Sequence, residues 1–254
     1  MRHPQWIVPD WPAPAAVRAL ITTRAGGYSQ GSWGAVDGSG GMNLGWGGDD
    51  AAAVERNRAR LRALLPQEPR WLQQVHGTEV VDAADAGQGL ARADAAVTSR
   101  AGIVCCVLVA DCLPVLLADT RGRGVAAAHA GWRGLAGGVI QNAVTALRGA
   151  VGDSEARILA YLGPAIGPMH FEVGPEVLAA MAQRLPQAQG AFVAASPGKF
   201  RADLGALARQ ALLQVHVPDV YGGGNCTVSD PARFYSFRRD GATGRHAALI
   251  WLQD

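Results

Sequence analysis

IVCCVLVADCLPVLLADTRGRGVAAAHA, residues 103–130, contains three apolar runs that are separated by short polar turns. The runs at 103–109, 115–118 and 124–128 are too short for helices and rich in Val, Leu and Ala, so we expect β-strands. They are nearly continuous rather than alternating, which is typical of strands buried on both faces. Within the first run, Cys105 and Cys106 should point to opposite faces of the sheet, because successive strand residues alternate.

The rest of the chain surrounds these strands with further strands and with helices. We expect strands at 71–75, 80–81, 95–98, 158–162 and 246–252, and helices near 51–64, 134–148, 175–185 and 202–214. Residues 26–48 are Gly-rich and are predicted to form a long loop or a linker. The mixture predicts an α/β or mixed α+β fold, with one sheet covered by helices. No repeat or convincing linker divides the chain, so we expect a single domain over residues 1–254.

Composition excludes several classes of partner. The 254 residues are 49% hydrophobic and 17% charged, with a net charge of +2 and Lys199 as the one lysine. No basic run is long enough to indicate binding to nucleic acid or to a membrane surface. We see no secretory signal and no apolar stretch long enough to span a bilayer. Three of the four cysteines lie within one short region, a poor disulfide framework, so we expect a cytoplasmic protein.

Two histidines and one cysteine form the most informative pattern. His76, Cys112 and His129 each lie where an apolar, strand-like run ends. Two imidazoles and one thiolate are the ligands of a catalytic zinc site with one open position. The three residues are too far apart for a single-loop zinc finger, but a sheet can bring them together. The alternative is that the cysteine is a small buried hydrophobe and that the histidines have unrelated partners.

Other polar residues near these positions are candidates for substrate binding or proton transfer. Asp111 precedes Cys112 and is a candidate acid/base, or a group that orients an imidazole. Arg24 precedes a Gly-rich loop and Arg133 lies at the start of an expected helix, and both places suit an anion. Arg238 lies in the segment FYSFRRDG, residues 234–241, which mixes aromatic and basic residues and is typical either of base stacking or of a packed turn.

Several motifs, taken together and in this order, resemble the YfiH-like family. They are TTR at 22–24, NLG at 43–45, QVHG at 74–77, ADCLP at 110–114, HAGWRG at 129–134, GPAIG at 163–167 and FYSFRRDG at 234–241. The resemblance covers the chain from about residue 6 to its C-terminus. It implies a mixed sheet in an α/β/α-like sandwich, similar to a deamidating cysteine-dependent toxin of the CNF type.

The resemblance also implies an activity and a set of site residues. The family is described as a polyphenol oxidase or laccase domain, as a zinc-dependent purine nucleoside phosphorylase with adenosine deaminase activity, and as a peptidoglycan editing factor. Its zinc ligands fall on His76, Cys112 and His129. Together with the loop positions above, the family pattern implies that Arg24, Asn43, Arg133 and Arg238 bind the substrate, a purine nucleoside with phosphate.

Two other activities remain open. Copper-dependent phenol oxidation would use the same two histidines and cysteine, and copper can replace zinc there. The chain has six histidines but no His-x-His pair, which argues against the several copper sites of a laccase. A cysteine amidase with Cys112 as nucleophile and His129 or His76 as base would instead suit peptidoglycan precursor editing.

Overall fold

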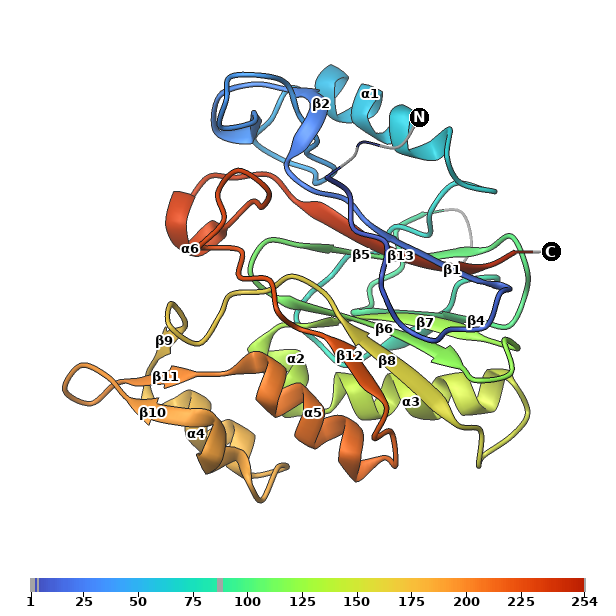
Figure 1. The fold of residues 1–254 in the computed structure, drawn as a ribbon, viewed down its shortest axis with the longest axis vertical. Coiled ribbons are helices and arrows are strands. Elements are labelled where there is room, and N and C mark those ends of the chain that lie inside the picture. The colour runs from blue at the N-terminus through green and yellow to red at the C-terminus, as the bar shows by residue number, and fades with distance from the viewer. Residues whose placement is uncertain (1–2, 4, 86–88, 254) are drawn as a thin grey trace.

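The apolar runs of residues 103–130 form strands β5, β6 and β7, which the computed structural model distributes over two stacked sheets (Figure 1). The structure describes residues 3, 5–85 and 89–253. The larger sheet has six strands in the order β12-β8-β6-β7-β4-β3. It is mixed, because β3 and β12 run parallel to their neighbours while the other pairs are antiparallel. Its strands are β3 (Val80–Asp82), β4 (Ala95–Thr98), β6 (Leu113–Asp119), β7 (Val125–Ala130), β8 (Ile158–Leu162) and β12 (Val220–Gly222).

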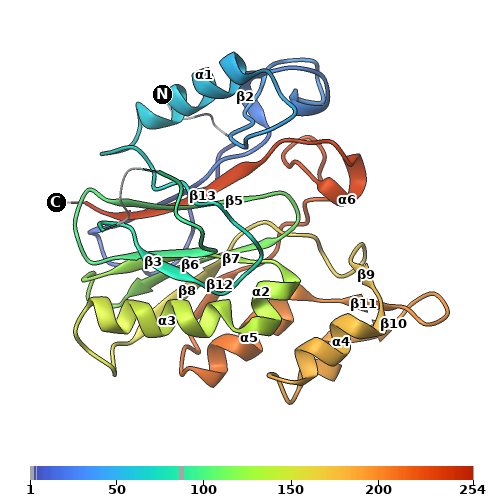
Figure 2. The ribbon, with the colours of Figure 1, turned by 180° about the vertical axis from the view of Figure 1, so that it is seen from behind.

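An antiparallel three-stranded sheet, in the order β1-β13-β5, lies on one face of the six-stranded sheet (Figures 1 and 2). A further small sheet, in the order β10-β11-β9, lies beside helix α4. The strands of these two sheets are β1 (Val17–Ile21), β5 (Val104–Val109), β13 (His246–Leu252), β9 (Glu172–Val173), β10 (Phe192–Ala194) and β11 (Phe200–Ala202).

Helices cover both outer faces of the stacked sheets. Helices α3 and α5 lie on the free face of the six-stranded sheet, and α1 lies over the three-stranded sheet (Figure 2). Asp50 caps α1 by accepting a hydrogen bond from the amide of Ala52. The helices are α1 (Ala51–Arg62), α2 (Trp132–Gly137), α3 (Val139–Ala150), α4 (Pro175–Ala182), α5 (Leu204–Gln214) and α6 (Phe237–Asp240), with 3₁₀ turns at Gly31–Trp33 and Ala188–Ala191.

Alternation along the strands explains why three buried layers form. In β6, Leu117 packs toward the helices, whereas Leu116 packs between the two sheets. In β5, Cys105 faces the layer between the sheets and Cys106 faces the layer under α1, so the predicted opposite orientation is confirmed. Both faces of these strands are therefore buried, as their continuous apolar sequence indicates. The predicted mixed α+β fold is confirmed, with a second sheet stacked on the first.

The predicted helix over 134–148 is two helices. It begins earlier, at Trp132, and breaks at Gly138, which adopts the left-handed conformation with φ 101°. Gly138 donates its amide to the carbonyl of Gly134, which ends α2 and lets α3 start in a new direction. After this break α3 covers the sheet (Figure 2). The start of α2 lies near Cys112, since a Cβ atom on its N-cap residue Gly131 would be 2.9 Å from Cys112 Sγ.

The predicted strand over 71–75 is wrong. Around it the structure has isolated bridges, from Arg70 to Cys105 and from Leu72 to Ala91. Besides these bridges, the amide of Gln73 donates to the carbonyl of Ala91. From residue 75 on, the Asp94 carboxylate takes the amides of residues 75 to 77, which ends any strand pairing and holds this part of the segment as a loop.

The Gly-rich segment 26–48 is folded, and it includes a strand, β2 (Ala25–Ser29), that the sequence analysis did not predict, as it also missed β1. Asn57 of α1 holds this segment in place. Its amide nitrogen donates to the carbonyls of Gly41 and Asn43, and its oxygen accepts from the amide of Tyr28. The segment is thus a long loop braced by α1 and not a linker.

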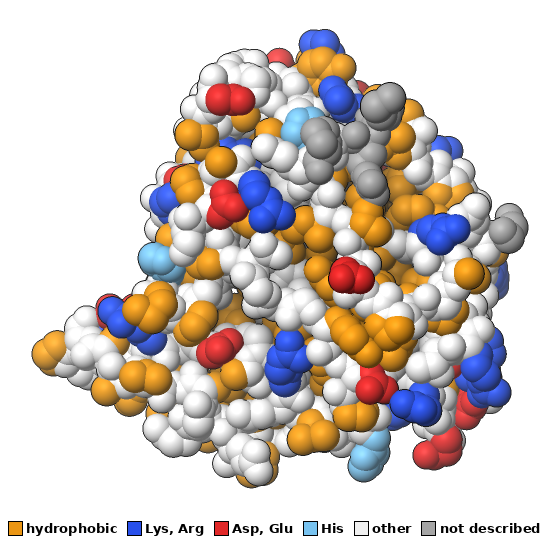
Figure 3. Space-filling view, in the orientation of Figure 1, with side chains coloured by type: hydrophobic (Ala, Val, Ile, Leu, Met, Phe, Trp, Pro, Cys, Tyr) orange, Lys and Arg blue, Asp and Glu red, His pale blue; other side chains and the backbone are white. Residues whose placement is uncertain are grey.

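Basic and acidic side chains are mixed rather than segregated. On the face drawn in Figure 3, they are interspersed with apolar ones. Several form ion pairs, such as Arg123 with Asp119 at 2.7 Å and Arg157 with Asp219 at 3.0 Å. Among the described residues no helix combines the length and the apolar character that crossing a membrane requires.

Candidate metal centre and its pocket

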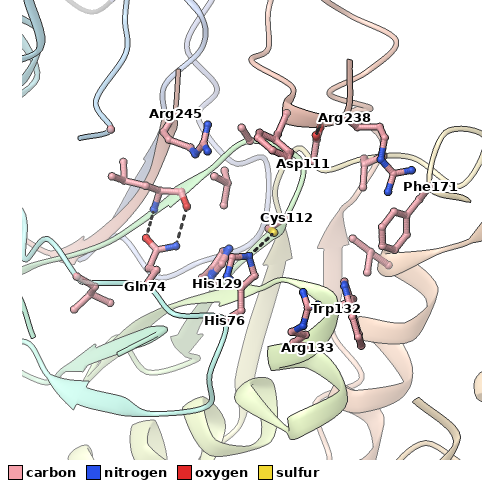
Figure 4. Close-up of a pocket in the computed structure, with 18 of the residues that line it drawn as sticks. Gln74, His76, Asp111, Cys112, His129, Trp132, Arg133, Phe171, Arg238 and Arg245 are labelled. Carbon is pink, nitrogen blue, oxygen red and sulfur yellow. Dashed lines mark hydrogen bonds between the residues drawn. The ribbon is translucent and has the colours of Figure 1, made fainter. Parts of the chain in front are cut away.

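His76, Cys112 and His129 converge on one point. Their nitrogen and sulfur donor atoms all lie within 4.8 Å of one another. Cys112 Sγ is 3.6 Å from His76 Nε2, and the two imidazole rings are 4.8 Å apart between centroids. Figure 4 shows the three side chains directed toward one another. The arrangement that the sequence predicts from separate strand ends is therefore present.

The neighbouring strands β6 and β7 bring two of these residues together. Cys112 directly precedes β6, and His129 is the penultimate residue of β7, where it pairs with Pro114. An antiparallel pair places such residues side by side. His76 is not on a strand. It lies in the irregular loop before β3, and its own backbone is left-handed, with φ 59°. The expectation that it follows a strand was wrong, although its position near the other two was right.

Asp94, which the sequence analysis did not single out, orients both histidines. Its buried carboxylate lies 2.8 Å from His129 Nδ1, so Nε2 of that ring is the nitrogen left for a metal. The same carboxylate accepts hydrogen bonds from the amides of Val75, His76 and Gly77, at 3.1, 2.9 and 2.7 Å. A carboxylate behind a ligating imidazole is the usual support of a protein metal site.

The surroundings favour an ionised thiol beside a charged imidazole. Burial opposes ionisation of Cys112, but the hydrogen bonds from His129 and His76 outweigh it and lower the thiol pKa to about 6. Burial likewise disfavours a charge on His129, but hydrogen bonds to Asp94 and Cys112 raise its pKa to about 9. Burial also opposes the charge on Asp94, and its hydrogen bonds to His129, Gly77 and Val75 nevertheless lower its pKa. The hydrogen bonds from the two histidines therefore favour the thiolate form of Cys112.

A glycine lies against two of the three donor residues. A Cβ atom at Gly131 would lie 2.8 Å from His76 Cδ2 and 2.9 Å from Cys112 Sγ, so a side chain there would displace these two donors. Two imidazoles and a thiolate are the ligand types that zinc and copper prefer. Within residues 3, 5–85 and 89–253, no second cluster of three His, Cys, Asp or Glu donors lies as close together.

The donors lie in a pocket of about 610 Å³. Three of the other residues that the sequence predicts for the site, Asp111, Arg133 and Arg238, line it, and Figure 4 shows them around the three donors. Arg24 and Asn43 do not line it. The remaining lining includes aromatic and polar side chains that the sequence analysis did not select, among them Trp46, Gln74, Trp132, Phe171, Phe237 and Arg245.

Asp111 uses both carboxylate oxygens in hydrogen bonds to the protein. It accepts from the hydroxyl of Thr227 at 2.5 Å and from the backbone amide of Arg238 at 2.6 Å. Its own backbone is left-handed, with φ 88°, in the turn between β5 and β6. Asp111 therefore connects the turn that carries Cys112 to the segment that carries Arg238. The carboxylate that contacts an imidazole is Asp94 instead.

Arg133 and Arg238 present guanidinium groups to the pocket over aromatic rings. The guanidinium carbon of Arg133 is 4.4 Å from the ring centroid of Trp132, and that of Arg238 is 5.5 Å from Phe171. Arg238 also donates to the carbonyls of His170 and Glu172. These contacts fix the direction of Arg238, so two positively charged side chains line the same pocket as Cys112.

Arg24 lies outside the pocket and is buried, with 8% of its surface exposed. Its Nε donates to the carbonyl of Gly34 at 2.7 Å, and its NH1 lies 3.4 Å from Asp240. Its guanidinium also lies over the ring of Tyr235. The structure therefore does not bring Arg24 together with the pocket residues, and its guanidinium contacts the Gly-rich loop through Gly34.

Asn43 is also buried outside the pocket, but it holds pocket residues in place. Its side-chain oxygen accepts from the amides of Gly45 and Arg245, at 2.9 and 2.8 Å, and its nitrogen donates to Asp49 at 2.8 Å. Gly45 and Arg245 both line the pocket. The structure thus gives Asn43 an indirect connection to the site.

Among the pocket residues that were not predicted from the sequence, Gln74 was the easiest to predict, because it lies two residues before the candidate ligand His76. Its side-chain amide pairs with both backbone groups of Leu108, at 2.7 and 2.8 Å, and so ties the His76 loop to the end of β5. Arg245, in contrast, has no candidate site residue near it in the sequence. It enters the pocket because it immediately precedes β13, the strand that pairs with β5.

The fold and the donor set define a mixed α+β protein with a candidate three-ligand metal centre. The model of the family described as multi-copper polyphenol oxidoreductase laccase matches residues 18–253. The chain therefore belongs to this family, and the resemblance to YfiH proteins that its motifs indicate is confirmed.

Relatives and solved structures cover nearly the whole chain. A protein of Pseudomonas aeruginosa named purine nucleoside phosphorylase is 52% identical over 251 residues, or 98% of this chain and 99% of that protein. The Escherichia coli K12 protein named purine nucleoside phosphorylase YfiH is 45% identical, over 97% of this chain and 98% of its own. The crystal structure of Neisseria meningitidis protein NMB0706 has a TM-score of 0.90 at 48% identity, covering 98% of this chain and 100% of that one. Bacillus licheniformis YfiH has a TM-score of 0.85 at 28% identity, with 93% of each chain covered.

Proposed function

We propose that this chain is a zinc-dependent purine nucleoside enzyme of the cytoplasm. Its reactions are phosphorolysis of adenosine, inosine, guanosine or methylthioadenosine to the base and a sugar 1-phosphate, and deamination of adenosine. The observation that carries the proposal is the convergence of His76, Cys112 and His129 in a pocket lined by arginines. The names of the relatives, purine nucleoside phosphorylase, support the phosphorolytic part.

In this proposal the ion is held by His76 Nε2, Cys112 Sγ and His129 Nε2. When bound, zinc supplies Lewis acidity toward a water molecule or a substrate oxygen. Copper forms stronger complexes than zinc with this kind of donor, so it is the expected substitute. Asp94 holds the ring of His129 and the backbone at His76, and thereby sets two of the three donors before any ion arrives.

The arginines of the pocket provide the charge that phosphorolysis needs. A phosphate oxygen bonds to C1′ of the ribose while the C1′–N9 bond breaks, and the purine leaves with that electron pair and takes up a proton. Arg133, Arg238 and Arg245 line the pocket and can donate N–H groups to the phosphate. We propose that Asp111 acts indirectly, because its carboxylate already accepts the amide of Arg238 and so fixes that arginine.

Two observations favour other activities. The family description supports copper-dependent phenol oxidation. The arrangement Cys112–His129–Asp94 has the order of a thiol, a base and an orienting carboxylate, which suits a cysteine amidase. Metal content separates these alternatives, since a thiolate that is bound to zinc is not available as a free nucleophile.

The test is elemental analysis of protein purified without added metal, followed by a nucleoside panel with and without phosphate. We expect about one zinc per chain, as for a three-ligand catalytic site, and phosphate-dependent release of free base. Cys112→Ala and His129→Ala should each lose zinc and turnover while remaining folded. Cys226→Ala, which removes a thiol outside the donor group, is the matched control and should keep both. Full zinc and activity in either site variant would contradict the assignment.

A further inference from the structure

Trp46 is an exposed aromatic residue of the pocket. It lines the pocket, yet 60% of its surface is exposed. It lies in the braced Gly-rich segment, next to Gly47 and Gly48, both of which have positive φ. Large exposed aromatic rings at the edge of a pocket are typical of binding surfaces, because their apolar faces gain from being covered.

One face of the Trp46 ring packs against the guanidinium of a buried arginine, Arg58. The guanidinium carbon of Arg58 lies 3.7 Å from the Trp46 ring and 4.1 Å from the ring of Trp71, so it is stacked between the two indoles. Arg58 is only 5% exposed, and its Nε and NH2 donate to the carbonyl of Leu44 at 3.1 and 2.6 Å. Because Arg58 is itself fixed by these hydrogen bonds, its stacking restricts the orientation of the Trp46 ring.

Among the described residues, Arg58 is the arginine over the Trp46 ring, whereas two other aromatic residues of the pocket carry an arginine that itself lines the pocket. Arg133 and Arg238, which lie over Trp132 and Phe171, themselves line the pocket and so occupy the side of those rings that a ligand would approach. Arg58 does not line the pocket. Because Arg58 is buried, it covers the inner face of the ring, and the exposed surface of Trp46 is what a ligand in the pocket can contact.

We propose that Trp46 is the base-stacking residue of this pocket, against which the flat base of a purine nucleoside lies on the face opposite Arg58. The proposal rests on the proposed function and places the base of the nucleoside against Trp46. Stacking tolerates different bases, because each presents a π-face, so Trp46 would select for a planar base without distinguishing adenine from hypoxanthine. Removing such a ring typically weakens binding by about 5- to 150-fold.

The experiment compares Trp46→Ala, Trp46→Phe and the wild-type chain, each with its metal. Guanosine binding is measured by calorimetry, and kcat and KM are measured for phosphorolysis of inosine. Tyr28→Ala is the matched control, because Tyr28 also carries an arginine over its ring, Arg56 at 3.8 Å, but lies outside this pocket. We expect Trp46→Ala to raise the guanosine Kd by about 5- to 150-fold and Trp46→Phe to restore most of the loss. Tyr28→Ala should bind like the wild type, and zinc content should be equal in all four.

The outcomes separate this proposal from the proposed function. Normal turnover and unchanged guanosine binding in Trp46→Ala would overturn the stacking role while leaving the enzyme assignment intact. The same holds if Phe237→Ala, which removes the other exposed ring of the pocket, loses affinity while Trp46→Ala does not. A wild-type chain that binds guanosine through Trp46 but does not cleave nucleosides would support stacking and refute the activity. A wild-type chain that binds no nucleoside would refute both.

Discussion

Asp94→Asn tests whether one buried carboxylate holds the two histidines of the candidate metal centre in place. One oxygen of Asp94 accepts from the His76 amide and from His129 Nδ1, and the other accepts from the amides of Val75 and Gly77. Asparagine replaces one oxygen with a donor, so two of these four hydrogen bonds are lost. At about 1.5–3 kcal/mol for each bond to a charged group, we expect a loss of about 3–6 kcal/mol in the free energy of unfolding. Zinc affinity should fall by about 10- to 100-fold, because the two histidines lose their orientation.

The assay combines urea unfolding with a competition titration of zinc against a chelator. Asp119→Asn is the matched control. Asp119 is equally buried and accepts from Arg123 at 2.7 Å, but it lies at the opposite end of β6 from Cys112. The control variant should lose stability and keep the zinc affinity of the wild type. If Asp94→Asn kept both stability and zinc affinity, the orienting role of this carboxylate would be refuted.

Three further predictions follow from the same geometry. Gly131→Ala should fold but retain little zinc in elemental analysis, because the new methyl group would meet two of the donor side chains at less than 3 Å. In metal-free protein, alkylation of Cys112 should increase as pH rises through about 6, since its lowered pKa leaves the thiolate as the form present above that pH; an increase only near the ordinary thiol pKa would contradict this. Arg24→Lys should lower the urea midpoint, through loss of the guanidinium bond to Gly34, and leave the KM for phosphate unchanged; a raised KM would return Arg24 to the substrate site.

Local sequence pattern was sufficient for the parts of the fold that depend on neighbouring strands. The apolar runs at 115–118 and 124–128 predict strands, and the structure pairs them antiparallel as β6 and β7, which places Cys112 near His129. Alternation predicts the opposite orientation of Cys105 and Cys106. The break at Gly138 was harder to predict, because an isolated glycine within a helical pattern is often tolerated.

Arginines near glycine-rich loops show where the sequence is ambiguous. A guanidinium beside such a loop can bind an anion or can brace the loop, and both uses require the same donors. Which of these two roles Arg24 has is decided by its contacts with Gly34 and with Asp240, a residue near the other end of the chain. Contacts of this separation are set by the packing of the whole fold, so local sequence could not decide between the two roles.

The two aspartates illustrate the same limit at the metal site. Asp111 is adjacent to Cys112 in sequence, which made it the obvious candidate to support an imidazole. Adjacent residues usually direct their side chains apart, however, and the carboxylate of Asp111 turns to Thr227 and Arg238. Asp94 directly precedes β4, and the pairing of β4 with β7 brings its carboxylate to His129. A carboxylate that orients a metal ligand is therefore best sought on the neighbouring strand, because strand pairing, and not sequence adjacency, decides which side chains meet.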